Sequence, residues 1–170
     1  MEVERISRYL FLFLVIFLIV LNLNSVVMAK NSNQYVLWEG LEPDQCGVAW
    51  LIKRFVNPEA KFKFVKKGTI VKEGISLDTP YSKIQRKHNQ PAFEVAMNRF
   101  ELKDPVLQRI SKIIWDIEIN KWDKKVTDEA AGLSAVIYGL AKVEKDYNQA
   151  LSKSFIIYDA LYAGLGGEKK

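Results

Sequence analysis

The pattern of apolar and polar positions divides the chain into a first part of short strands around one helix and a second part of helices. Residues 35–38 are an extended apolar piece, and residues 61–65 alternate polar and apolar side chains, as in a half-buried strand. Residues 69–77 offer one or two more strands. After the first strand, apolar residues recur at three- and four-residue spacing and predict a helix that Asp44 caps and that ends before Asn57.

From Pro91 onward the apolar spacing is helical. One helix begins at Pro91, where the first turn tolerates proline. A second begins at Asp104 and Pro105 and should run for at least three turns. Thr127 is positioned to cap a third, and a fourth covers about residues 148–165. The side chains predicted to face inward are Phe93, Met97 and Phe100, then Ile110, Ile113, Ile114 and Ile117, then Ala130, Leu133, Val136, Ile137, Leu140 and Ala141, and finally Leu151, Phe155, Tyr158 and Tyr162.

These elements place the chain in the α+β class, with a small N-terminal β-sheet and one helix followed by a four-helix α-rich half. A chain of 170 residues has room for one domain with a sizeable hydrophobic core. We expect that domain to be residues 30–170, because residues 1–29 have the features of a signal peptide.

The first 29 residues combine a charged start, an apolar centre and small residues before a cut after Ala29, which are the features that signal peptidase recognises. A retained membrane anchor is the alternative. A spanning helix needs about 20 apolar residues, whereas Asn22 interrupts the apolar run of residues 9–21. The sequence therefore predicts an exported, periplasmic protein. It would contact the membrane only if the signal segment stayed uncleaved.

The formal net charge of +5 comes from lysines scattered among acidic residues. Nucleic-acid-binding proteins usually concentrate basic residues on one face of the molecule. We therefore expect no nucleic-acid partner.

Cys46 is the single cysteine and cannot form an internal disulfide. Three roles stay open for it, namely a buried thiol, an intermolecular bridge or a ligand. Common catalytic and nucleotide-binding motifs are absent, including CxxC, HExxH, GxSxG, GxGxxG and the P-loop.

Two basic groups are candidates for binding an oxyanion. Arg86 and His88 stand just before the helix at Pro91, where free amides and the helix dipole favour anions. Lys53 and Arg54 lie on the first helix; arginine can hold an oxyanion bidentately while lysine adds a point charge. The simpler alternative is a solvated or capping His88 and cations that extend outward from a core helix.

A second candidate set would hold a hard metal ion, since imidazole and carboxylate groups are suitable ligands. It consists of His88, Glu94, Asp116 and Glu118. Asp116 and Glu118 point to different faces of a helix but to one face of an extended segment. They could share a cation only if the preceding helix ends before them. The alternative is a pair of helix-end carboxylates on a solvated or lysine-paired face.

Several short blocks follow one another over about residues 36–163. They are Trp38-Glu39-Gly40, Asp44 with Trp50-Leu51-Ile52-Lys53-Arg54-Phe55 and Pro58-Glu59-Ala60, His88-Asn89-Gln90 with Phe93-Glu94, Asp116-Ile117-Glu118-Ile119-Asn120, Glu129-Ala130-Ala131-Gly132, and Tyr158-Asp159-Ala160-Leu161-Tyr162. In this order they resemble the chromate resistance exported protein family, which is similar to the C-terminal domain of the chromate-responsive regulator. Cys46 and Ala49 depart from the pattern of the cytoplasmic relatives, in which cysteine directly precedes a Pro-Trp pair.

The resemblance implies a bacterial, exported protein linked to chromate resistance. We expect it to bind or sense chromate or a related oxyanion through Asp44, Lys53, Arg54, Arg86 and His88. Two alternatives stay open, namely a metal-dependent enzyme that uses a divalent metal at the second candidate set, and a ligand-free partner of a membrane transporter. No catalytic residues and no reaction follow from the sequence, because a flavin, haem or nicotinamide signature is absent.

Overall fold

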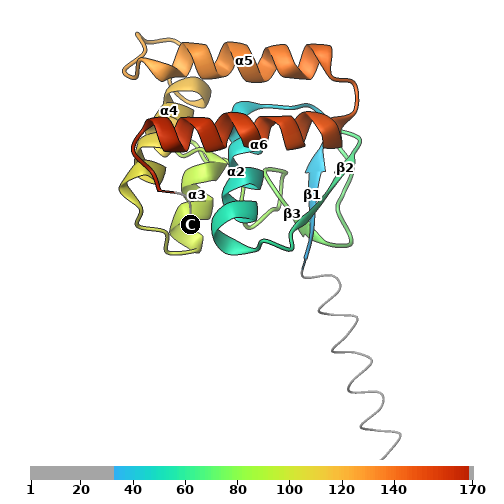
Figure 1. The fold of residues 1–170 in the computed structure, drawn as a ribbon. Helices are drawn as coiled ribbons and strands as arrows, with labels where there is room; N and C mark the ends of the chain where they lie inside the picture. Colours follow the sequence, from blue (N-terminus) through green and yellow to red (C-terminus); the bar gives the residue numbers. More distant parts are fainter. Residues whose placement is uncertain (1–32, 169–170) are drawn as a thin grey trace, which may run out of the picture.

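The computed structural model describes residues 33–168, so the predicted signal peptide lies outside the described residues. Within the described part, three strands, five α-helices and one π-helix form the fold (Figure 1). In chain order they are β1 (Gln34–Trp38), α2 (Pro43–Leu51), η1 (Ile52–Val56), β2 (Lys61–Val65), β3 (Ile75–Ser76), α3 (Ala92–Arg99), α4 (Pro105–Glu118), α5 (Glu129–Val143) and α6 (Tyr147–Gly164). This order confirms the predicted α+β class.

The sheet has the order β2-β1-β3, and both pairings are parallel. Parallel neighbours need a crossover connection, which α2 and η1 provide between β1 and β2. Tyr35 of the central strand pairs with Phe62 on one side and Ile75 on the other. Of the one or two strands predicted over residues 69–77, one forms, namely β3. Residues 69–71 form no strand; Thr69 N donates to Lys66 O in a turn, and Ile70 is 76% exposed.

The first helix begins two residues earlier than predicted. Pro43 is its first residue and Glu42 its N-cap, so the prediction that Asp44 caps this helix was wrong. The helix passes directly into the π-helix η1, and Asn57 N donates to Ile52 O where the helical run ends, as the proline after Asn57 predicted.

Helix α2 lies at the centre of the fold and packs against all the other α-helices of the described part (Figure 1). Gly47 makes this possible, because a Cβ there would lie 2.8 Å from Ile114 Cδ1 and 3.0 Å from Phe93 Cδ2. One turn further along α2, Trp50 stacks on Tyr158 with ring centroids 5.6 Å apart. The central helix is therefore held by close packing on several sides.

Helix α4 confirms the predicted start and face. The Asp104 carboxylate accepts hydrogen bonds from the amides of Val106 and Leu107, as an N-cap side chain does. The predicted inward residues are buried, with exposed fractions of 0% for Ile110, Ile113 and Ile114 and 9% for Ile117. Pro91 in turn precedes α3 as its N-cap residue.

Helix α5 differs from the prediction in its capping residue and in one side chain, whereas α6 agrees with it. Helix α5 has Asp128 as its N-cap residue, so the prediction that Thr127 caps it was wrong; the Thr127 hydroxyl donates to Asp116 instead. Val136 was predicted to face inward but is 50% exposed. In α6, Leu151, Tyr158 and Tyr162 are buried as predicted.

None of the helices between residues 33 and 168 has the length and apolar character needed to cross a bilayer.

Candidate functional site

The guanidinium of Arg86 meets four carboxylates that come from separate parts of the fold. Its Nη1 lies 3.0 Å from Glu118 Oε2, and its Nη2 lies 3.2 Å from Glu42 Oε2. The Nε atom lies 3.5 Å from Asp44 Oδ2, and Nη2 lies 3.5 Å from Asp78 Oδ2. We call these five residues the Arg86 cluster. It joins the start of α2, the loop after β3 and the end of α4.

Asp44 connects the Arg86 cluster to the start of α3. Its Oδ2 accepts from the amide of Ala92 at 2.7 Å, and its Oδ1 accepts from the amide of Phe93 at 2.8 Å. A carboxylate from α2 thus supplies the acceptors that the first turn of α3 lacks. Burial, followed by repulsion from Asp78, nevertheless raises the pKa of Asp44 to about 7, although both amides and Arg86 favour its charge.

Two further carboxyl groups of the cluster hold their protons more tightly than usual. Burial raises the pKa of Glu118 against the effect of Arg86, and burial also raises the pKa of Asp78. Glu118 Oε1 has no hydrogen-bond partner among the described residues. An unpaired buried oxygen disfavours the charged carboxylate. The cluster can therefore take up protons near neutral pH.

Arg86 itself stays charged. Burial opposes its charge, but the carboxylates of Glu118, Asp78, Asp44 and Glu42 outweigh burial and raise the pKa of the guanidinium above its ordinary value. Its side chain is 26% exposed, so it remains open to solvent on one side. The cluster thus combines a permanent cation with acids that can become neutral hydrogen-bond donors.

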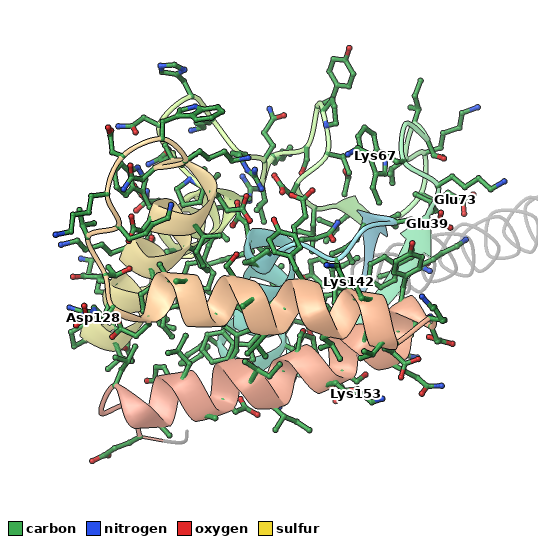
Figure 2. All side chains as sticks on the ribbon, turned by 90° about the horizontal axis from the view of Figure 1, so that it is seen from above. Glu39, Lys67, Glu73, Asp128, Lys142 and Lys153 are labelled. Atoms are coloured by element: carbon green, nitrogen blue, oxygen red, sulfur yellow. The ribbon has the colours of Figure 1, made fainter. Side chains whose placement is uncertain are left out.

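A pocket of about 210 Å³ opens on the exposed side of Arg86. Its lining consists of Trp38, Glu39, Gly40, Glu42, Gln45, Lys67, Asp78 and Arg86. Lys67 brings a second cation from the loop after β2; Figure 2 shows it with Glu39 on the side of α5 away from α6. Gln45 donates from Nε2 to Trp38 O at 3.0 Å, and its buried Oε1 has no hydrogen-bond partner among residues 33–168.

The basic helix residues predicted to join Arg86 lie elsewhere. Arg54 is ten residues beyond Asp44 on one continuous helical run, which corresponds to about 15 Å along the helix axis. Its guanidinium pairs with the Asp159 carboxylate at 2.7 Å. Lys53 donates to the carbonyls of Pro58 and Ala60. The structure therefore brings together Asp44 and Arg86 of the predicted oxyanion set, and it places Lys53 and Arg54 at the other end of the helix.

The predicted metal set is dispersed. His88 is exposed in the loop before α3, and Glu94 accepts from Gln90 Nε2 at 2.7 Å. Glu118 belongs to the Arg86 cluster, whereas Asp116 faces the loop after α4. Among residues 33–168, no group of three or more histidine, cysteine, aspartate or glutamate side chains is arranged to hold a metal ion.

Asp116 stabilises the loop between α4 and α5. Its Oδ2 accepts from the amides of Val126 and Thr127, both at 2.9 Å, and from the Thr127 hydroxyl at 2.8 Å, while Oδ1 accepts from Asn120 Nδ2 at 2.7 Å. Burial opposes its charge, but these donors outweigh burial and lower the pKa of Asp116. The side chain is 0% exposed, so the alternative of a solvated helix-end carboxylate was wrong.

Cys46 lies in the core with an exposed fraction of 0%. Burial raises the pKa of its thiol to about 12, although a hydrogen bond with Ser154 acts in the opposite direction. Because the thiolate is the reactive form of cysteine, the side chain acts here as a small apolar group. Of the three open roles, the structure supports the buried thiol.

Sequence reasoning missed several members of the site. Glu42, Asp78, Gln45 and Lys67 line the pocket, but none belongs to a motif or shares a helical spacing with Arg86. Tyr138 was also missed; burial, followed by the charges of Glu118 and Glu42, raises the pKa of its phenol to about 12. The one feature of the sequence that pointed to these residues was the concentration of acidic side chains just before the first helix.

A family model described as "ChrB, C-terminal domain" matches residues 35–165. No curated protein and no solved structure gave a significant match. The match covers more than half of the chain and nearly all of the described residues, including every member of the Arg86 cluster. The chain therefore belongs to the family of the ChrB C-terminal domain, which links it to chromate resistance.

Proposed function

We propose that this protein is exported and that it binds or senses chromate or a related oxyanion in the pocket beside Arg86. The observation that carries the proposal is a permanently charged guanidinium at the wall of a pocket to which Lys67 adds a second cation. Arginine offers planar, paired donors to tetrahedral oxyanions, and lysine adds a point charge. Membership of a family linked to chromate resistance supports chromate or a related oxyanion as the ligand.

Proton uptake allows an anion to bind next to so many acids. When charged, the four carboxylates outnumber Arg86 and Lys67, and each has an oxygen within 3.5 Å of a guanidinium nitrogen. Protonation of Asp44, whose pKa is raised to about 7, removes charge directly behind Arg86. Burial raises the pKa of Asp78, and a protonated Asp78 at the pocket wall becomes a donor to the oxyanion. Affinity should therefore strengthen as pH falls through about 7.

Asp44 provides a route from ligand binding to a change in shape. The same carboxylate contacts Arg86 and accepts from the first two amides of α3. An oxyanion that takes over donors of Arg86 changes the charge balance at Asp44 and therefore the strength of the α3 cap. This coupling suits a sensing role better than a purely storage role.

Replacing Lys67 by methionine tests the pocket without disturbing its buried acids. Lys67 is exposed, so the fold should be retained, while the loss of one cation should weaken chromate binding by roughly 5- to 10-fold at low ionic strength. Lys66→Met is the matched control, because the adjacent lysine is also exposed and does not line the pocket. Isothermal titration calorimetry with chromate and with sulfate measures both.

Two results would oppose the proposal. Equal affinities of the Lys66 and Lys67 variants would place the ligand elsewhere on the molecule. The absence of heat with either anion at millimolar concentration would remove the oxyanion function altogether.

Export is the second part of the proposal, and it rests on the sequence of residues 1–29. The mature protein recovered from a periplasmic fraction should begin at Lys30. Intact-mass spectrometry of that fraction decides the point. A full-length species in the membrane fraction would instead make the protein an anchored domain.

A further inference from the structure

Helix α5 presents an uncovered apolar face. It forms the outermost layer of the helical part, with α6 beneath it (Figure 1). Two of its larger apolar side chains, Val136 and Val143, share one face of the helix and are 50% and 79% exposed. Exposed apolar side chains gathered on one helix face are typical of an interaction surface.

Two glycines on that face have no explanation within the described chain. A Cβ at Gly132 or at Gly139 would meet no atom within 4 Å. Glycine weakens a helix relative to alanine, so both positions reduce helix stability without relieving a contact. Their spacing places them on the same helix face as Val136 and Val143. Glycine allows another backbone to approach closely, as it does at Gly47 inside the core.

The charges at the two ends of α5 are of opposite sign. Asp128 stands at its N-terminus and makes no side-chain capping bond, and Lys142 stands near its C-terminus. Figure 2 shows the two residues toward opposite ends of the helix. They are separated by 14 positions, which corresponds to about 21 Å along the axis. A helix with this distribution is complementary to an antiparallel copy of itself.

From these observations we infer that the outer face of α5 binds the same face of a second copy of this chain. A two-fold axis near Ala135 brings Asp128 of each copy beside Lys142 of the other, and Gly132 beside Gly139. Such an isologous contact closes on itself as a dimer. A neighbouring hollow of about 530 Å³, lined in part by Trp122, Ala131 and Ala135, extends the available surface beyond the helix.

Sedimentation velocity of the purified protein over a range of concentrations tests the dimer. Val136→Asp places two carboxylates near the two-fold axis and should weaken dimerisation at least about tenfold, because like charges in a contact are strongly unfavourable. Ile156→Asp is the matched control, since Ile156 is an exposed apolar side chain (68%) on α6 and should leave the dimer intact. Equal effects of the two substitutions would overturn the inference.

Charge reversal tests the orientation. Asp128→Lys alone and Lys142→Asp alone should each weaken the dimer, and the double variant should restore it, because the pairs form again with reversed sign. Failure of the double variant to restore dimerisation would overturn the antiparallel arrangement. A protein that stays monomeric at all concentrations, or that instead binds vesicles of anionic phospholipid through Val136, would overturn the inference as a whole.

Discussion

Replacement of Arg86 by methionine is expected to lower the free energy of unfolding by about 3–5 kcal/mol at pH 8, since removal of one partner leaves buried charges uncompensated. Four carboxylates surround this guanidinium, and Asp44 and Glu118 are almost wholly buried. At pH 5 the loss should be smaller, because the carboxyl groups with raised pKa can bind protons in place of the lost cation. Urea denaturation at the two pH values measures both.

The control is Arg109→Met. Arg109 pairs with Glu129 at 3.1 Å, but its side chain is 46% exposed. An exposed pair of this kind contributes less than about 1 kcal/mol, with little difference between the two pH values. A loss for Arg86→Met that stays below about 1 kcal/mol, or that is equal at pH 5 and pH 8, would show that the cluster is not the electrostatic centre described above.

The unsubstituted protein should show the same proton linkage. Asp44 has an ordinary value of 3.8 and a folded pKa of about 7, so the folded protein holds this proton over a range in which the unfolded chain has lost it. Its contribution to stability is therefore fully present below pH 3.8 and is lost as pH rises through about 7. Asp116 has the opposite sign; its lowered pKa means that its contribution is lost only in strong acid.

Replacement of Ile113 by alanine is the second large effect, with an expected loss of about 2–5 kcal/mol. Ile113 is 0% exposed in the middle of α4, so truncation removes buried methylene groups and leaves a cavity. Lys112→Ala is the control, because the neighbouring side chain is exposed and should change stability by less than about 0.5 kcal/mol. Thermal or urea denaturation gives both values. A loss for Ile113→Ala below about 1 kcal/mol would contradict the assigned buried face.

Local signals were sufficient for much of the fold. The isoleucine stripe of α4 is set by helical periodicity, and the cap at Asp104 lies next to the amides that it serves. Asp44 shows why other features could not be predicted. Its partners, Ala92 and Phe93, are nearly fifty positions away in the sequence. The local pattern therefore predicted that Asp44 caps the helix next to it, whereas its carboxylate caps α3.

The candidate site was predictable only in part. Arg86 and Asp44 were named from the sequence, and the structure places them in one cluster. Arg54 was named for the same chemistry, but helical rise carries it to the opposite end of the run from Asp44. Asp78 and Lys67 reach the pocket through loops, whose course depends on tertiary packing and leaves no periodic pattern in the sequence.

The location of the bound anion tests the central claim most directly. Crystals of the protein soaked with chromate, and measured with X-rays near the chromium absorption edge, would show the chromium atom by its anomalous signal. The proposal predicts a peak in the pocket lined by Gln45, Lys67 and Arg86, in contact with the Arg86 guanidinium. A peak beside Arg54 or His88 instead, or no peak in that pocket, would contradict it.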